Sequence, residues 1–458
     1  MRYALGLVLL VLLAAAAWWI FRPAPSAVVS ADVTTYLTGD PDEGFARVTE
    51  PRPLVFPADE GAHPAYQTEW WYYTGNLAAS EAAGRDAGRR FGYQLTFFRS
   101  SLEPEPDPRD SAWGTGQVYL AHFTVSDVAA GAFHSAERFA RGGAGLAGAE
   151  IVTALAAPRV WLETWSAAPT GDPSQDGETA QESAPATGSL AGDGATLPFD
   201  PVLVELDLEP GGTGFADPTQ RVDPDAAATT RLTRPSLRLR AADGPVAIDL
   251  SVRPAKPAAL HGREGYSVKG DAPGNASFYY SWSRLEATGT FTTADGVFPV
   301  EGYSWMDHEW STSALAEGQT GWDWFSLQLD DDTELMAFQI READGGIAPQ
   351  SSGSLIDPDG AVTPFGAEEL AIEVLDTWTS PRTGGEYPNG WRLRLPEREV
   401  DLTVTPLLDD QELAVSFRYW EGAVRVEGTV EGRTVSGYGY VEMTGYAPTA
   451  DGSAGPGL

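Results

Sequence analysis

Four consecutive aromatic residues stand in the run Glu69-Trp70-Trp71-Tyr72-Tyr73-Thr74-Gly75-Asn76-Leu77, the most informative stretch of the chain. Side chains alternate between the two faces of a β-strand, so Glu69, Trp71 and Tyr73 share one face. The opposite face carries Trp70, Tyr72 and Thr74. Large rings on both sides predict that one face packs as core while the other lines a cavity or a second interface. A carboxylate beside such rings, here Glu69, is suited to holding an apolar ligand and to protonating it.

The rest of the chain reads as strands and turns, because Gly and Pro are frequent and no convincing helical period follows the N-terminal segment. We expect further strands at residues 90–99, 118–125, 279–285, 289–291 and 303–310, and a hairpin at residues 322–341. About two dozen such strands are too many for one small barrel and suit two. The sequence therefore predicts an all-β fold, with two consecutive antiparallel β-barrels after an N-terminal apolar helix.

The expected domains follow from these patterns and from shifts in composition. They are an N-terminal signal or anchor helix at 1–22, an extended linker at 23–60, barrel 1 at 61–315, barrel 2 at 316–447 and a disordered tail at 448–458. Barrel 1 contains a low-complexity insertion at about 166–200 that is rich in small and polar residues.

The composition is unusual in its large excess of acidic residues. The 458 residues include 30 Lys and Arg against 65 Asp and Glu, a net charge of −35. Phosphate backbones need a basic face, so we expect no nucleic-acid partner. An acidic surface poor in Lys fits a salty habitat, and a GC-rich genome is the alternative explanation. The absence of Cys excludes disulfides, thiolate metal ligands and thiol nucleophiles.

The N-terminus predicts a membrane-directed segment. An uncharged apolar run at residues 3–21 lies between Arg2 and Arg22 and is long enough to span a bilayer. It also resembles a secretory signal, although no small-residue cleavage site follows it. We expect an uncleaved anchor in the inner membrane, with the globular part periplasmic or otherwise extracytoplasmic.

A second informative stretch runs from Tyr303 to Ser311. Trp305, Asp307 and Glu309 share one face of this strand, and Met306, His308 and Trp310 share the other. Two carboxylates on one buried face are costly without partners, so one acid in a closed cavity would have a raised pKa and act as a proton donor. The alternative is that Asp307 and Glu309 pair with Arg or bond turn amides.

A third stretch, residues 273–285, places Tyr280, Trp282 and Arg284 on one strand face, where Arg284 could keep an acid ionised. The five His residues form no metal-type pair, and no glycine-rich phosphate loop is present. We therefore expect neither a metal nor a cofactor. His122 is most simply a hydrogen-bonded barrel residue.

These segments together resemble the lipocalin-like family of carotenoid 1,2-hydratases and AttH-type secreted proteins. The similarity rests on Glu69–Leu77, Tyr93–Arg99, Ala121-His122-Phe123, Pro273–Leu285, Ser304–Ser311 and Trp322-Asp323-Trp324-Phe325. It spans residues 55–445 without the insertion, and it implies two consecutive lipocalin-like barrels.

The hydratase branch of this family, as the resemblance implies, adds water across a terminal C=C of an acyclic carotenoid. An aspartic acid protonates the alkene and aromatic rings stabilise the cation. The acid corresponds to Asp307, and a Trp on the preceding strand corresponds to Trp282. This chain departs from the pattern with Tyr280 in place of a His and Trp305 in place of a Tyr.

The candidate residues divide into two groups. The catalytic candidates are Asp307, Trp282, Tyr280 and Trp305, and the ligand-binding candidates are Glu69, Trp70, Trp71, Tyr73, His122, Glu309 and Trp310. The main hypothesis is an anchored protein that binds or transfers a hydrophobic, isoprenoid or lipid-like molecule, as an accessory of an ABC-type export permease. The alternatives are a carotenoid 1,2-hydratase-like lyase, a cyclase-like template, and a domain pair whose rings only fill the core.

Overall fold

The computed structural model describes residues 44–104, 111–172, 236–312, 315, 316, 318–416 and 418–447. These residues form 25 strands and three short 3-10 helices, namely η1 (Ala58–Glu60), η2 (Glu81–Asp86) and η3 (Pro396–Arg398), and no α-helix. Within these ranges, no helix combines the length and hydrophobicity that a bilayer crossing requires. The expected N-terminal helix and the C-terminal tail lie outside the described residues.

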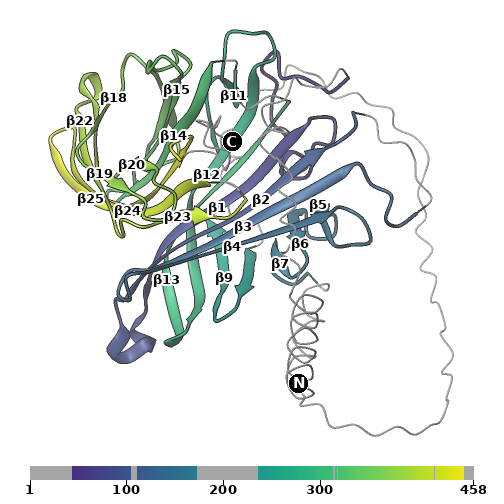
Figure 1. Cartoon of the computed structure of the whole chain (residues 1–458), viewed down its shortest axis with the longest axis horizontal. Coiled ribbons are helices and arrows are strands. Elements are labelled where there is room, and N and C mark those ends of the chain that lie inside the picture. Colours follow the sequence, from purple (N-terminus) through teal and green to yellow (C-terminus); the bar gives the residue numbers. More distant parts are fainter. Residues whose placement is uncertain are drawn as a thin grey trace, which may run out of the picture.

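The first thirteen strands make up one antiparallel sheet, ordered β4-β3-β2-β1-β13-β12-β9-β8-β7-β6-β5, with β10 and β11 paired to β12 (Figure 1). The strands are β1 (Thr68–Ala79), β2 (Arg90–Ser101), β3 (Gln117–Asp127), β4 (Ala132–Arg141), β5 (Ala147–Val152), β6 (Ala157–Leu162), β7 (Trp165–Pro169), β8 (Leu237–Asp243), β9 (Val246–Pro254), β10 (Ala259–Leu260), β11 (Tyr266–Val268), β12 (Ala276–Thr293) and β13 (Gly296–Ser311). We call this sheet and its core barrel 1.

The remaining strands form a second sheet, ordered β17-β16-β15-β14-β25-β24-β22-β21-β18, with β23 paired to β24, and a separate β19–β20 pair. They are β14 (Gln319–Leu329), β15 (Glu334–Glu342), β16 (Ser352–Ile356), β17 (Val362–Gly366), β18 (Ala371–Val374), β19 (Thr377–Thr379), β20 (Glu386–Pro388), β21 (Trp391–Leu395), β22 (Val400–Pro406), β23 (Glu412–Ala414), β24 (Arg418–Val430) and β25 (Arg433–Thr444). We call this sheet barrel 2, and Figure 1 shows it packed beside barrel 1. The predicted all-β fold with two successive sheets is confirmed.

The central pair of barrel 1 is β1 and β13, and its register decides which side chains meet. Tyr72 lies opposite Asp307, and Trp71 lies opposite His308. Opposed residues of an antiparallel pair point to the same face. Tyr72 and Asp307 therefore share the outer face, while Trp71 and His308 share the face that turns into the barrel.

Each barrel encloses its own hydrophobic core, and a third cluster lies between the two barrels. Trp71, Tyr73 and Met306 belong to the core of barrel 1, whereas Phe325 and Trp391 belong to that of barrel 2. The third cluster, which we call the seam, joins rings from both sheets: Tyr72, Tyr279, Trp305, Trp324 and Phe338. Both faces of the first quoted stretch are buried because one faces core and the other faces the seam.

Three features differ from the expected pattern. Residues 165–169 form β7 at the beginning of the expected insertion, and residues 173–235 lie outside the described part of the chain. The two short strands expected at residues 279–285 and 289–291 are one long strand, β12. Residues 44–60 of the expected linker pack on barrel 1, where Val48 is fully buried in its core.

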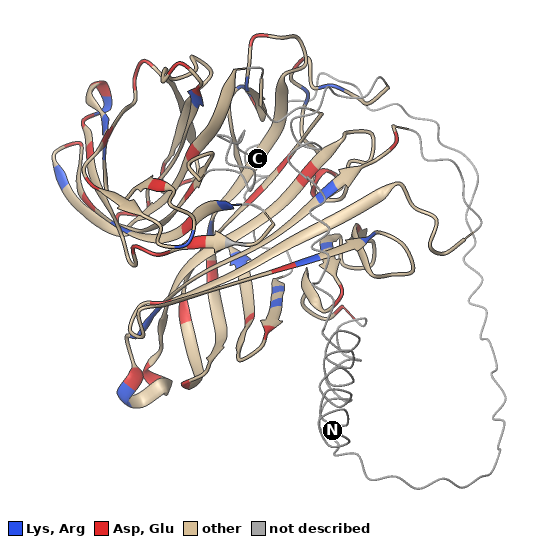
Figure 2. Cartoon of the chain, viewed as in Figure 1, with Lys and Arg blue, Asp and Glu red and all other residues tan. Residues whose placement is uncertain are grey.

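Acidic side chains are spread over the strands and turns of both barrels (Figure 2).

A buried ion-pair cluster lies where the barrels meet. Glu334 of β15 is fully buried and accepts from Lys256 Nζ at 2.9 Å and from Arg284 Nε at 2.5 Å. Both bases belong to barrel 1, so this carboxylate ties the second sheet to the first.

We expect Glu334→Gln to lower the free energy of unfolding by about 3 kcal/mol, because two buried cations lose their shared counter-charge. Urea unfolding would measure this loss. The exposed Glu373→Gln, whose partner Arg394 is 3.8 Å away, is the matched control and should change stability by less than about 0.5 kcal/mol. Equal unfolding midpoints for the two variants would contradict the proposed tie.

Candidate functional site

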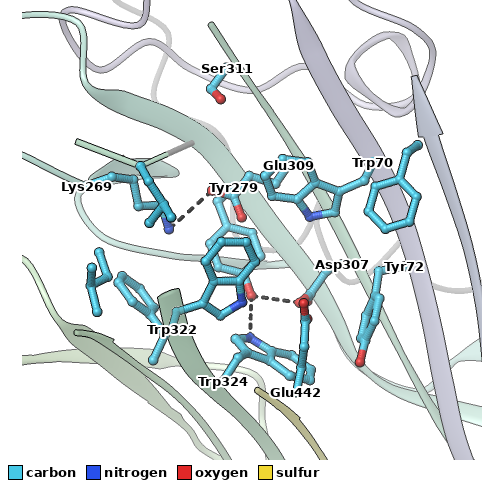
Figure 3. Close-up of a pocket in the computed structure, with 14 residues that line it drawn as sticks. Trp70, Tyr72, Lys269, Tyr279, Asp307, Glu309, Ser311, Trp322, Trp324 and Glu442 are labelled. Atoms are coloured by element: carbon cyan, nitrogen blue, oxygen red, sulfur yellow. Dashed lines mark hydrogen bonds and ion pairs between the residues drawn. The ribbon is translucent and has the colours of Figure 1, made fainter. Parts of the chain in front are cut away.

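A cavity opens at the seam, with about 900 Å³ of empty space that includes its open side. Barrel 1 contributes Trp70, Tyr72, Tyr279, Asp307 and Glu309 to its wall, and barrel 2 contributes Trp322, Trp324, Phe338 and Glu442. Figure 3 shows these side chains directed into one space from the two sheets. Neither barrel encloses the cavity alone, so the site exists only when both sheets are folded and docked.

Asp307 is buried at this site and accepts three hydrogen bonds. Ser281 Oγ and Trp305 Nε1 both donate to Oδ1, the second at 2.6 Å, and Tyr279 OH donates to Oδ2 at 2.7 Å. Trp324 Nε1 of barrel 2 in turn donates to Tyr279 OH at 3.0 Å (Figure 3). This network fixes the orientation of the carboxyl group relative to the cavity.

Burial raises the pKa of Asp307 to about 7, although Ser281, Tyr279 and Trp305 each lower it by hydrogen bonding. The nearby charge of Glu309 adds to the rise. The expected partner Arg284 is bonded to Glu334 instead, and Lys269 pairs with Glu309 at 3.2 Å. A carboxyl with this pKa exists in both protonation states near neutral pH, which suits proton transfer.

The hydroxyl group that bonds Asp307, Ser281 Oγ, is itself in contact with a buried histidine. His261 Nε2 lies 2.6 Å from Ser281 Oγ, and its Nδ1 lies 3.0 Å from Ser354 Oγ of β16. Burial, together with the charge of Lys269, lowers the pKa of His261 to about 3, so the ring is neutral. Because Ser281 gives its single hydroxyl proton to Asp307, it can only accept from His261 Nε2, and a chain of hydrogen bonds runs from Ser354 of barrel 2 to the acid.

Two further acids lie on barrel 2 near the cavity. Burial raises the pKa of Glu442 to about 8, with a contribution from the charge of Asp307. Glu421 lies opposite Glu442 in the β24–β25 pair, and burial raises its pKa well above the usual range. Tyr72 OH donates to Glu421 at 2.7 Å across the seam. The sequence analysis did not identify five residues of this site: Glu442, Glu421, Tyr279, Ser281 and His261. Of these, Glu442 and Glu421 could have been found, because an acid inside an otherwise apolar strand is unusual.

The structure divides the predicted site residues between two places. Trp70, Asp307 and Glu309 line the seam cavity, and Trp305 bonds Asp307 from the same face. The remaining candidates lie inside barrel 1 or beside the contact with barrel 2: Glu69, Trp71, Tyr73, His122, Tyr280, Trp282 and Trp310. Tyr73 and Trp282 line a second, smaller cavity in barrel 1, with about 430 Å³ of empty space that includes its open side. His122 bonds Tyr419 of β24 and Glu137, so its expected place as a hydrogen-bonded barrel residue is correct.

The expectation that Tyr280, Trp282 and Arg284 share a face is wrong. A bulge between Trp282 and Leu285 shifts the register of β12 against β13. Tyr280 and Trp282 therefore pack in barrel 1, while Arg284 turns to barrel 2. Opposed pairs place Tyr279 with Glu309 and Ser281 with Asp307, so the residues that contact the acid lie one position away from the two expected ones.

One group among the described residues brings three metal-type ligand atoms within 4.8 Å of one another, from His63, Glu69 and His308. His63 Nδ1 and His308 Nε2 lie 2.7 and 2.8 Å from Glu69 Oε1. Arg99 Nε donates to Glu69 Oε2 at 2.7 Å, and its charge together with both imidazoles lowers the pKa of Glu69 despite complete burial. Asp59 also accepts from His63 and from Arg52, and His308 Nδ1 lies 3.1 Å from Tyr280 OH, so both ring nitrogens of each histidine already have a partner. We interpret this group as an ion-pair cluster that fastens residues 52–63 to barrel 1.

We expect the free energy of unfolding of Asp307→Asn to increase relative to that of the unmodified protein as pH rises. The folded pKa of Asp307, about 7, lies above the usual 3.8, so the folded state binds an extra proton between these values. Stability therefore falls from about pH 4 to about pH 7, by up to about 4 kcal/mol, and the amide lacks this loss. Urea midpoints across the window would measure it, and a gap independent of pH would exclude the raised pKa.

Comparison with known proteins agrees with this architecture. The crystal structure of an AttH-like protein from Nitrosomonas europaea matches with a TM-score of 0.64 and 29% identity, over 88% of this chain and all of the other. Kievitone hydratase from Nectria haematococca shares the fold, with a TM-score of 0.50 and 13% identity over 87% of this chain and 97% of the other. These similarities confirm the two lipocalin-like barrels.

A curated sequence relative is kievitone hydratase from Fusarium solani subsp. phaseoli, which is 28% identical over 179 residues. This alignment covers 36% of the present chain and 49% of the relative, about half of its length. The AttH-like family model matches residues 47–191 and 210–446. Because that match covers most of the sequence, the chain belongs to the AttH-like family.

Proposed function

We propose that this protein is a hydro-lyase that adds water to, or removes it from, a C=C bond of an apolar molecule held at the seam. The observation that carries the proposal is Asp307, a carboxyl with a pKa of about 7 that lies in a ring-lined cavity and forms no ion pair with any described residue. Relatives named as hydratases support the same reaction class.

The substrate would be apolar over most of its length, because the cavity wall is mostly indole, phenol and phenyl surface. Burial of such a ligand contributes about 0.8 kcal/mol per CH₂. An isoprenoid or prenyl-bearing molecule fits this chemistry, since protonation of a branched alkene produces a tertiary cation. Trp70, Trp322 and Trp324 would stabilise that cation by about 0.5–2 kcal/mol each where a ring face meets it.

The reaction would begin with transfer of the Asp307 proton to the less substituted alkene carbon. The cation left on the neighbouring carbon is attacked by water, and the water proton must pass to a base in the cavity. The three donors on Asp307 stabilise its carboxylate after the transfer, which lowers the barrier to giving up the proton. Exclusion of bulk water by the surrounding rings protects the cation until the captured water reacts.

Binding and transfer without chemistry is the second candidate. It is supported by the same apolar wall and by the open side of the cavity, through which a long ligand could extend. Placement outside the cytoplasm, anchoring by residues 1–22 and partnership with an ABC-type permease belong to this candidate and are proposals that rest on the sequence.

We expect the purified full chain to incorporate label from ¹⁸O-labelled water into an apolar alkene, within a panel that includes an acyclic carotenoid and prenylated phenols. Asp307→Asn should lower turnover by at least about a hundredfold, because the amide has no acidic proton to give. Binding, measured by quenching of tryptophan fluorescence, should be retained because the amide keeps the shape of the site.

Mass spectrometry of ligand extracted from the native protein would identify the molecule to add to the panel. Tight binding without label incorporation by the unmodified protein would favour the carrier. Equal turnover by Asp307→Asn would refute Asp307 as the acid.

A further inference from the structure

The seam cavity contains a second carboxyl group that faces Asp307 from the other barrel. Glu442 extends from β25 into the cavity, and Figure 3 shows it directed towards the space that Asp307 and Tyr279 border. It lies opposite Trp324 in the β14–β25 pair, and Trp324 donates to the same Tyr279 hydroxyl that bonds Asp307. Two acids from separate sheets therefore border one reaction space.

Neither acid has a basic partner in the part of the chain that the structure describes. Among the residues that the structure describes, ion pairs at the cavity are limited to Lys269 with Glu309. Glu442 instead accepts a hydrogen bond from the side chain of Trp322. The titratable or charged groups that face Glu442 from the surrounding elements are Asp307 and Glu309 of β13, Glu421 and Tyr419 of β24, Tyr72 of β1, Tyr279 of β12 and Lys269 before β12. Three of these groups are carboxyls and one is a base, which pairs with Glu309, so ionisation of both Glu442 and Asp307 is unfavourable.

We propose that Glu442 is a second catalytic carboxyl, which shares one proton with Asp307 and forms with it an acid–base pair across the seam. This inference rests on the proposed hydro-lyase function and names the base that the reaction requires. One member of the pair holds the proton and the other is ionised, as in other sites where two carboxyls lie close together.

The two carboxyls together account for both proton transfers of the reaction. The protonated carboxyl gives its proton to one alkene carbon, which forms a C–H bond and leaves a cation on the other carbon. Water forms the C–O bond, and the ionised carboxyl takes the proton that the water loses. The pair again holds one proton, now on the opposite member, and exchange between the two carboxyls restores the starting state. Dehydration follows the same steps in reverse.

The first test is the titration of protonated carboxyl groups by their infrared C=O stretch, in the full chain from about pH 5 to about pH 10. The step that disappears in Glu442→Gln identifies Glu442. In Asp307→Asn this step should move down by at least about one pH unit, because the repelling charge is gone. An unshifted Glu442 step would overturn the shared proton. Glu427→Gln, exposed on β24, is the control and should leave every step in place.

The second test is turnover of a panel member that the unmodified protein hydrates. Glu442→Gln should lower kcat at least about a hundredfold and remove one limb of the pH profile, with KM and fluorescence quenching little changed. Glu442→Asp, which keeps the acid, should restore part of the activity. A thermal unfolding scan would establish that each variant folds.

The outcomes separate the two claims. Full activity of Glu442→Gln, in a protein that hydrates the probe, would refute the second carboxyl and leave the proposed function standing. A coupled titration without turnover by the unmodified protein would refute the catalytic role of the pair together with the proposed function.

Discussion

The register between β1 and β13 is the constraint on which the rest of the structure depends. It pairs Tyr72 with Asp307 and Trp71 with His308, so that Trp70 and Tyr72 of β1 and Trp305 and Asp307 of β13 face the seam. A shift by one residue would send the acid into the core of barrel 1 and expose core rings to barrel 2. Long strands with bulky side chains on both faces make such a shift costly, and this fixes the place of the acid.

The same strand pair holds acids in two opposite electrostatic states. Glu69, on the inner face, meets Arg99 and two imidazoles, and stays ionised despite complete burial. Asp307, on the outer face, meets hydroxyl and indole donors and other acids, and its pKa rises to about 7. The difference lies in the partners and not in burial, since both side chains are inaccessible to bulk water. One acid consequently serves the fold, and the other is available for chemistry.

The seam combines two kinds of contact between the barrels. Glu334 with Lys256 and Arg284 supplies a charged tie, and the rings around Trp324 supply an apolar one. Between them remain acids that no cation of the described residues neutralises, and such acids cost stability unless they are protonated. A fold that keeps such groups at the contact of two sheets uses part of its docking energy to hold the acids of the proposed site in place.

The sequence by itself determined the fold class and the two-faced strands. Unbroken alternation in residues 69–77 and 303–311 specified which side chains share a face, because the two-residue repeat of a strand is local. The family resemblance singled out Asp307 as the acid, while an ion pair with Arg284 stayed open. The sequence could not reveal the β12–β13 register, which places Tyr279 and Ser281 on the face of the acid, or the bulge after Trp282, which turns Arg284 towards barrel 2.

Only the tertiary structure decided where the cavity lies and which acids share it. Asp307 and Glu442 are far apart in sequence and belong to different sheets, so no local pattern relates them. Their approach follows from the docking of one barrel on the other, which depends on the shapes and charges of two complete surfaces. The same holds for Glu69 and Arg99, whose pairing comes from the β1–β2 register and the path of residues 52–63. Local periodicity fixes the direction of each side chain, and long-range packing selects its partner.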